Sequence, residues 1–272
     1  MKLNIVKSIV SYKNPELKNL RLLFDKGRER KKQGLFVIEG EREIKKALSG
    51  KYLLKKIFIE NKSQLNYSEI KNTSESAQIY EVEKSIFERI GRRSGSEKII
   101  AIAKIKSHEL KDLFLPKNGL IIVVEAPEKP GNIGALYRTA AASKIDAIII
   151  ADPKNDLYNP NIIRSSLGSV FLVPTALASS KKVITFLKNK SFQIVTTFLE
   201  KKGISYNKYE YQTPCALVFG MESIGLNENW YNVSDQNLVI PMSDNIDSLN
   251  LSVSAAIFMY EATRKNNRLE KK

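Results

Sequence analysis

The first residues whose types could do chemistry follow an apolar stretch at 120–124. They read Glu125-Ala-Pro-Glu-Lys-Pro-Gly-Asn132-Ile-Gly-Ala-Leu-Tyr-Arg138. A Pro-Gly turn followed by Asn132 predicts a helix start, because an Asn side chain caps the free backbone N–H groups there. Arg138 lies six residues further on, and its long side chain could reach the same end of the helix. Asn132 and Arg138 could therefore both reach the same edge of the sheet. The alternative is a capped helix with a solvated arginine.

A second polar segment follows an apolar stretch at 216–219 and reads Gly220-Met-Glu222-Ser-Ile-Gly225. Two glycines flank one carboxylate, and glycines let the backbone approach a ligand closely. Taken alone, this pattern of Gly and Glu is common in loops, so it predicts a ligand-binding loop only in combination with the other segments.

A third polar segment begins at Ile240-Pro-Met, after an apolar stretch at 238–239. It ends at Ser248-Leu249-Asn250, directly before a long apolar helix pattern. Ser248 and Asn250 are therefore expected either to cap this helix or to contact a ligand.

Residue types exclude several familiar kinds of site. His108 is the one histidine and Cys215 the one cysteine, which excludes a disulfide framework and a His- or Cys-rich metal site and disfavours a His-dependent triad. Neither a G-x-G-x-x-G dinucleotide motif after a strand, nor a P-loop, nor a G-x-S-x-G nucleophile motif occurs. Acid–base chemistry would therefore fall on Asp, Glu, Lys, Arg or Tyr.

Strands and helices that position these segments alternate from residue 119 onward. Short apolar stretches predict strands, at 120–124, 147–151, 171–173, 193–197, 216–219 and 238–240. Helices are expected at 133–143, 160–167, 181–188 and 251–268. This alternation predicts a parallel sheet with helices on both faces. Ligands of such sheets bind at the carboxyl ends of the strands, where all three polar segments start.

The first part of the chain is strongly basic. Formal net charge is +15, and residues 1–120 hold 27 Lys and Arg against 15 Asp and Glu, whereas residues 121–272 hold 17 against 14. This imbalance indicates a polyanionic partner for the first part, unless the lysines form a solvated face. An expected helix at 15–32 and several short strands predict a small α/β domain over residues 1–110. A second domain is expected over 118–272.

Together, the three polar segments resemble the motifs of the SpoU/TrmH family of RNA ribose 2′-O-methyltransferases, in the SPOUT superfamily. They read Asn132-x-Gly-Ala-x-x-Arg138-Thr-Ala, Phe-Gly220-x-Glu222-x-x-Gly-Leu, and Ile240-Pro-Met followed by Ser248-Leu-Asn250-x-Ser-Val. Their order and spacing match the family over more than half of the chain. The basic first part is similar to the family's substrate-binding domain; its marks are residues 26–32, the run Phe36-Val-Ile-Glu39-Gly40 and the loop 92–96.

Membership of this family implies an α/β fold whose C-terminal part forms a deep trefoil knot, preceded by a small α/β RNA-binding domain. It implies S-adenosylmethionine as cofactor, with no metal, and a homodimer formed through the C-terminal domain. The resemblance assigns cofactor binding to Thr196, Gly220, Ile240, Ser248 and Leu249. It assigns catalytic roles to Arg138, Asn132, Glu222, Ser248 and Asn250.

The implied reaction is methyl transfer to a ribose 2′-hydroxyl, which DNA lacks. A separate N-terminal domain favours large-subunit ribosomal RNA as the substrate. Three alternatives remain: a tRNA enzyme, a non-catalytic RNA-binding protein on the same scaffold, and a related enzyme that methylates a base nitrogen. The longest apolar runs are far shorter than the roughly 20 residues of a membrane span, and no signal peptide is visible at the N-terminus. We therefore expect a cytoplasmic protein with no membrane partner.

Overall fold

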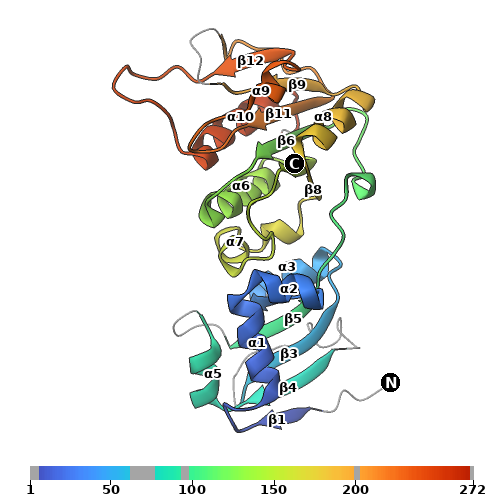
Figure 1. Cartoon of the computed structure of the whole chain (residues 1–272), viewed down its shortest axis with the longest axis vertical. Coiled ribbons are helices and arrows are strands. Elements are labelled where there is room, and N and C mark those ends of the chain that lie inside the picture. Colours follow the sequence, from blue (N-terminus) through green and yellow to red (C-terminus); the bar gives the residue numbers. More distant parts are fainter. Residues whose placement is uncertain (1–5, 62–76, 93–97, 199–202, 270–272) are drawn as a thin grey trace. The chain divides into compact units, whose positions relative to one another are not determined.

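The computed structural model describes residues 6–61, 77–92, 98–198 and 203–269. The chain divides into two compact units (Figure 1). Unit 1 comprises Met1–Lys106 and Asp156–Leu172, and unit 2 comprises Ser107–Asn155 and Val173–Lys272. The predicted second domain at 118–272 therefore differs from unit 2, since a segment from its middle belongs to unit 1.

Unit 1 is built on a five-stranded sheet with the order β1-β4-β3-β5-β2. Its strands are β1 (Lys7–Ile9), β2 (Leu35–Glu39), β3 (Leu54–Glu60), β4 (Gln78–Val82) and β5 (Ile99–Lys104). Strands β1, β4 and β3 pair in parallel, whereas β5 runs antiparallel to both β3 and β2. Its helical elements are α1 (Pro15–Asp25), α2 (Gly27–Gln33), α3 (Glu41–Ser49), α5 (Lys84–Ile90), α7 (Pro160–Ser165) and the short turn η2 (Ser169–Phe171).

Helices α1 and α2 replace the single helix expected at 15–32. Lys26 between them has an extended conformation with φ of −121°, which interrupts the helical hydrogen bonds. Arg30 of α2 turns inward, and its Nη1 donates to the carbonyls of Leu23 (2.6 Å) and Phe24 (3.1 Å). These carbonyls close α1 and have no partner within the helix, so Arg30 supplies the bonds that a continuous helix would have made.

An ion pair with a buried arginine and aromatic packing hold the segment Asp156–Leu172 in unit 1. Arg30 is 3% exposed, and its Nε donates to Asp156 Oδ2 at 2.5 Å. The ring of Tyr158 stacks on Phe36, with centroids 4.1 Å apart. Both contacts join residues more than a hundred positions apart in the chain, which is why helix and strand periodicity did not predict them.

Unit 2 contains a seven-stranded sheet with the order β10-β12-β9-β11-β6-β7-β8, and all of its pairings are parallel. Its strands are β6 (Leu120–Glu125), β7 (Ala147–Ala151), β8 (Thr175–Ala178), β9 (Gln193–Thr196), β10 (Ile204–Ser205), β11 (Cys215–Phe219) and β12 (Gln236–Val239). The predicted parallel sheet is confirmed. The strand predicted at 171–173 is wrong: the ring of Phe171 packs on Tyr52 in unit 1, so the chain joins the sheet only at β8.

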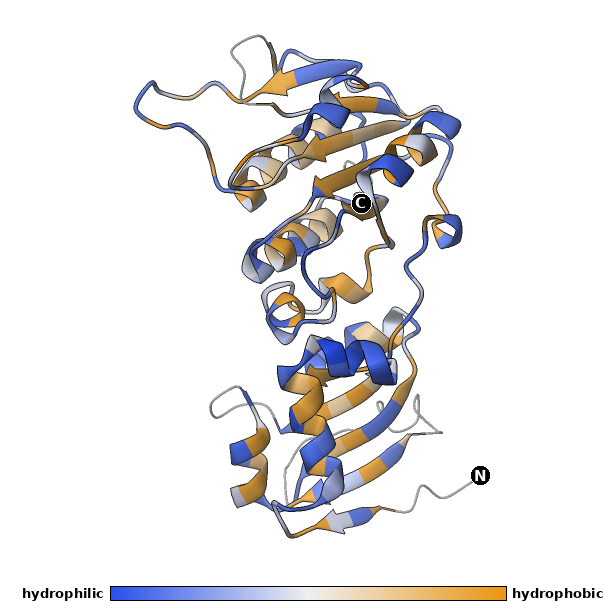
Figure 2. Ribbon diagram, viewed as in Figure 1, coloured by the Kyte–Doolittle hydropathy of each residue, from blue (hydrophilic) through white to orange (hydrophobic). Residues whose placement is uncertain are grey.

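Helices cover both faces of this sheet, and its central strands β6, β7 and β11 are strongly hydrophobic (Figure 2). The helical elements are α6 (Pro130–Ala142), α8 (Ser180–Asn189), α9 (Glu228–Tyr231), α10 (Leu251–Lys265) and the short turn η1 (Leu110–Asp112). Helix α10 packs on α6 and β11, while α8 packs on β7 and β9 beside α9. In the described ranges, no helix is both long and apolar enough to cross a membrane.

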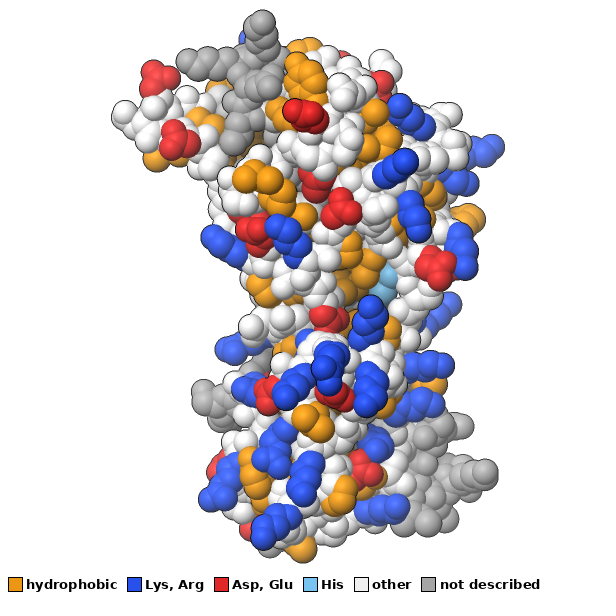
Figure 3. Space-filling model, viewed as in Figure 1, with side chains coloured by type: hydrophobic (Ala, Val, Ile, Leu, Met, Phe, Trp, Pro, Cys, Tyr) orange, Lys and Arg blue, Asp and Glu red, His pale blue; other side chains and the backbone are white. Residues whose placement is uncertain are grey.

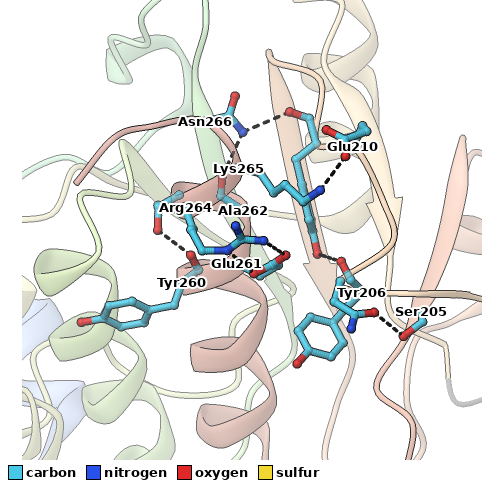
Figure 4. Close-up of polar contacts among 12 residues, drawn as sticks. Ser205, Tyr206, Glu210, Tyr260, Glu261, Ala262, Arg264, Lys265 and Asn266 are labelled. Carbon is cyan, nitrogen blue, oxygen red and sulfur yellow. Dashed lines mark hydrogen bonds and ion pairs between the residues drawn. The ribbon is translucent and has the colours of Figure 1, made fainter. Parts of the chain in front are cut away.

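The last turn of α10 is fastened to the segment between β10 and β11 (Figure 4). Lys265 Nζ pairs with Glu210 Oε1 at 2.5 Å, and Asn266 Nδ2 donates to the carbonyl of Tyr211 at 3.0 Å. The hydroxyl of Tyr211 in turn donates to the carbonyl of Tyr206 at 2.8 Å. These bonds fix the C-terminal end of α10, whose N-cap residue is Asn250.

Candidate active site

The polar segments converge because they follow neighbouring strands. Strands β12, β9, β11 and β6 lie side by side and run in the same direction, so their carboxyl ends share one edge of the sheet. The loop after β6 leads into α6, the loop after β11 carries Glu222, and the segment after β12 leads to Asn250 and α10. This is the edge at which open α/β sheets bind ligands.

One residue from each polar segment joins a continuous chain of hydrogen bonds. Asn132 Nδ2 donates to Glu222 Oε1 at 2.8 Å, and Asn250 Nδ2 donates to Asn132 Oδ1 at 3.1 Å. Residues 90 and 118 positions apart are thereby connected through side chains alone. The structure brings these three predicted catalytic residues together.

The Glu222 carboxylate lies at the N-terminus of α6. Its Oε2 accepts a hydrogen bond from the backbone N–H of Glu128 at 3.3 Å. Burial by itself would raise the pKa of Glu222. Hydrogen bonds from Asn132 and from the backbone N–H groups of residues 222, 128 and 129 outweigh it, and the pKa falls below its ordinary value. Glu222 is therefore an ionised, fixed acceptor at neutral pH, in a position that a helix dipole favours.

Each of the two glycines of the second segment is required at its position for a different structural reason. A Cβ added at Gly220 would lie 2.1 Å from the backbone carbon of Gly225, so the loop closes only with glycine at this position. Gly225 has φ of +72°, the left-handed region that favours glycine. Met221 and Gly225 exchange two backbone hydrogen bonds of 3.0 Å, and this tight loop presents Glu222.

Asn132 and Asn250 differ in their positions at the starts of α6 and α10. Asn250 caps α10, since its Oδ1 accepts from the backbone N–H of Ser252 at 2.9 Å. The expectation that Asn132 caps a helix is wrong: α6 already begins at Pro130, and Lys129 is the N-cap residue. Asn132 lies inside the first turn, which leaves both ends of its amide for Glu222 and Asn250.

Arg138 and Ser248 stay apart from this network. Arg138 is exposed on α6, and within the described part of the chain its guanidinium has no hydrogen bond or ion pair. Ser248 is exposed in the segment before α10, and no side-chain hydrogen bond joins it to other described residues. Both side chains are therefore available to a substrate or cofactor.

The predicted cofactor-binding residues lie at the ends of β9, β11 and β12 and before α10. Gly220 and Ile240 directly follow β11 and β12, and Leu249 precedes Asn250. Thr196 ends β9, but its side chain is buried and its Oγ1 already bonds Ser234 Oγ at 2.7 Å. Thr196 could therefore offer a ligand its backbone rather than its hydroxyl.

Glu125 is a structural member of the site that the sequence did not single out for a role. It ends β6 and is 2% exposed. Its carboxylate accepts from Ser180 Oγ at 2.8 Å and from the backbone N–H of Asn227 at 3.0 Å. It thus ties three loops at the same edge. An acidic residue at the end of an otherwise apolar strand is the signal that could have found it.

Comparison with known proteins decides the family. Residues 119–260 match the SpoU rRNA Methylase family, and residues 14–101 match the MRM3-like substrate binding domain. The chain belongs to the SpoU methylase family. The Asn132, Glu222 and Asn250 segments all lie within the first of these two matches, and unit 1 contains the whole of the second.

Full-length relatives agree with this assignment. A 23S rRNA (guanosine(2553)-2′-O)-methyltransferase, RlmP of Bacillus subtilis, is 27% identical over 255 residues, covering 94% of this chain and 98% of its own. A crystal structure of an RNA 2′-O ribose methyltransferase has a TM-score of 0.81 at 31% identity, covering 97% of this chain and 100% of its own. An AdoMet-bound rRNA methyltransferase from Sinorhizobium meliloti has a TM-score of 0.86 at 24% identity, covering 98% and 99%, which shows a shared fold.

Proposed function

We propose that this SpoU methylase transfers a methyl group from S-adenosylmethionine to a ribose 2′-hydroxyl of large-subunit ribosomal RNA. The observation that carries this proposal is the hydrogen-bonded chain Asn250–Asn132–Glu222, which joins one residue from each of the three family motifs. Asn132 lies on α6, the helix that also carries Arg138. The names of the relatives support the substrate, because the Bacillus subtilis protein is a 23S rRNA ribose methyltransferase.

The residues at the sheet edge fit S-adenosylmethionine. Strands β12, β9 and β11 are neighbours, so their carboxyl ends adjoin. The segments after β11 and β12 expose apolar side chains that a planar adenine could cover: Ile224, Met242 and Ile246. Gly220, Ile240, Leu249 and Ser248 would hold the cofactor together with the backbone of Thr196. When bound, it supplies an electrophilic methyl group on a sulfonium. The Sinorhizobium meliloti relative, with the same fold, binds AdoMet.

The side chains of the chain itself would align and stabilise the acceptor. Arg138 would stabilise the developing 2′-oxyanion or clamp the adjacent phosphate. It is poorly suited to accept a proton, since a guanidinium stays protonated in proteins. The lowered pKa of Glu222 also makes this carboxylate a weak base. We therefore assign Glu222 the role of orienting Asn132 toward the ribose, with Asn250 and Ser248 completing the acceptor side.

Unit 1 offers a basic surface for the RNA. Residues 13–32, which include its first two helices, carry six exposed Lys and Arg side chains that make no hydrogen bond or ion pair within the described ranges: Lys13, Lys18, Lys26, Arg28, Lys31 and Lys32. Such side chains gather on the visible face of unit 1 (Figure 3). Unpaired cations on one surface are the pattern expected for phosphate contacts. Residues 1–110 would thus form the RNA-binding domain; most of the predicted basic loop at 92–96 lies outside the described residues.

An uncovered stripe on α10 supports a homodimer. Val253 and Tyr260 are 49% and 47% exposed, and the half-buried Ala256 and Ile257 lie between them at helical spacing. An apolar stripe along a helix normally packs on another element, and a second copy of unit 2 would cover it. The deep trefoil knot implied by the resemblance is supported by the order β10-β12-β9, in which a later strand lies between two earlier ones. A cytoplasmic location agrees with ribosomal RNA as the substrate.

Ribose-methylation mapping of total RNA, with and without this protein, tests the proposal. We expect the loss of one ribose methyl group from large-subunit ribosomal RNA. Purified protein with labelled S-adenosylmethionine should then modify that RNA, and nuclease digestion should place the label on the ribose. A label on tRNA, a label on a base, or RNA binding without cofactor binding would each support one of the alternatives instead.

A further inference from the structure

Asn155 binds the loop that precedes α6. It lies in the run Asp152-Pro-Lys-Asn-Asp after β7, a run to which the proposed reaction gives no role. Asn155 Nδ2 donates to two successive carbonyls, those of Pro127 (3.0 Å) and Glu128 (2.7 Å). One side-chain amide therefore holds two adjacent peptide groups.

The first of these peptide groups also orients Glu222. The carbonyl of Pro127 and the N–H of Glu128 belong to one planar peptide. The N–H of Glu128 donates to Glu222 Oε2 at 3.3 Å. In a trans peptide the C=O and N–H bonds point in opposite directions. Asn155 thus fixes the carbonyl end of the peptide whose N–H end binds Glu222, and it also holds the carbonyl of the next peptide.

Lys154 contributes only weakly to holding the loop before α6. Its Nζ lies 2.8 Å from Glu128 Oε1, but the two side chains are 50% and 38% exposed. Exposed ion pairs of this kind contribute little, because water screens them and both long side chains lose freedom. Beyond the backbone bond from Ala126 to Ala151 at its start, the loop is therefore oriented chiefly by the half-buried Asn155, whose two bonds go to backbone carbonyls.

We propose that Asn155 is a positioning residue for methyl transfer, which acts through the 127–129 loop on Glu222 and thereby on Asn132. This inference rests on the proposed function. The inference adds Asn155, which lies outside the three motifs, to the residues that support methyl transfer. Its expected effect is on the rate of transfer and not on the binding of RNA or cofactor.

Single-turnover methyl transfer on ribosomal RNA, with the full chain, tests this role. We expect Asn155→Ala to lower the rate at saturating RNA and S-adenosylmethionine about tenfold, since small displacements of an orienting group are costly. The dissociation constants for RNA and cofactor should stay within about twofold of wild type. Asn189→Ala, which truncates an exposed asparagine at the end of α8, should match wild type in all three measurements. Asn155→Asp keeps the side-chain size but turns a carboxylate toward two carbonyls, and should reduce the rate at least as much as Asn155→Ala.

A double-mutant cycle separates positioning from a general structural effect. If Asn155 acts through Glu222, adding Asn155→Ala to Glu222→Ala should lower the residual rate by less than about twofold. A tenfold loss in both backgrounds, a wild-type rate in both Asn155 variants, or a loss confined to the dissociation constants would overturn the inference. These outcomes differ from failure of the proposed function, in which the wild-type protein itself would not methylate a ribose.

Discussion

Asn250→Asp should separate two roles that one side chain combines. Asn250 Oδ1 accepts the backbone N–H of Ser252 at 2.9 Å and its hydroxyl at 2.7 Å, which caps α10. Asn250 Nδ2 donates to Asn132 Oδ1 at 3.1 Å. Aspartate retains the capping oxygen and removes the donor, whereas Asn250→Ala removes both. The aspartate variant should therefore fold like wild type and react more slowly, and the alanine variant should be impaired in both respects.

The expected losses of stability and of rate follow from the usual energies of a helix cap and of a hydrogen bond. Replacing an N-cap asparagine by alanine costs about 1 kcal/mol of stability, and aspartate caps as well as asparagine does. For a domain of this size, 1 kcal/mol lowers the midpoint of thermal unfolding by about 2–4 °C. A hydrogen bond contributes about 1 kcal/mol, and a barrier raised by that amount slows a reaction about fivefold. An aspartate would also face Asn132 Oδ1 with a charged oxygen, so we expect a loss of about fivefold to tenfold.

Thermal unfolding and single-turnover methyl transfer measure the two effects separately. Asn159→Asp is a matched control, because Asn159 caps α7 in the same way, accepting from the N–H of Asn161 at 2.9 Å, and takes no part in the site network. It should keep both the midpoint and the rate. A wild-type rate in Asn250→Asp would refute the role of its amide in the network, and equal losses of stability in Asn250→Asp and Asn250→Ala would refute its assignment as the cap.

Three further predictions concern the charged groups. Arg138→Ala should slow single-turnover transfer on the order of 100-fold with cofactor affinity unchanged, as for the removal of one oxyanion donor; a decrease below about threefold would contradict this role. The pKa of Glu222 lies below the ordinary carboxyl value, so any stability that its ionised form confers is fully present above that ordinary value and is lost as the pH falls through the lowered pKa. Asn132→Ala removes one donor, raises this pKa, and should move the acid limb of the pH–rate profile to higher pH. Lys31→Glu and Lys32→Glu should each weaken RNA binding and reduce the slope of log affinity against log salt by about 0.7–0.9 for each phosphate that the variant no longer binds.

The sequence could predict the residues of the central network because their order and spacing are constrained. Asn132, Glu222 and Asn250 each follow a strand of one parallel sheet, and parallel strands bring their carboxyl ends to one edge. The pattern also predicted the parallel sheet. It did not predict which atoms meet: the capping role expected of Asn132 belongs to Asn250, because Pro130 starts α6 earlier than the apolar periodicity indicates.

Helix and strand periodicity could not predict contacts between polar side chains and backbone atoms far away in the sequence. Asn155 binds carbonyls more than twenty residues away, and nothing in the run around it differs from an ordinary Asp-Pro turn. The sequence of the segment Asp156–Leu172 likewise shows no pattern that would assign it to unit 1. Its place in unit 1 depends on Arg30 and Phe36, whose partners no local pattern specifies.

The choice of asparagine at two positions of the network follows from the ionisation of Glu222. An ionised carboxylate can only accept, so the Asn132 amide must turn its Nδ2 toward Glu222. That orientation leaves Asn132 Oδ1 as an acceptor, which requires a donor from Asn250 Nδ2. Asn250 Oδ1 is then left to accept, and the N-terminus of α10 supplies the N–H of Ser252. One charge thus fixes the direction of every bond from the start of α6 to the start of α10. An amide carries a donor and an acceptor on one rigid group, so asparagine can pass that direction on at both positions.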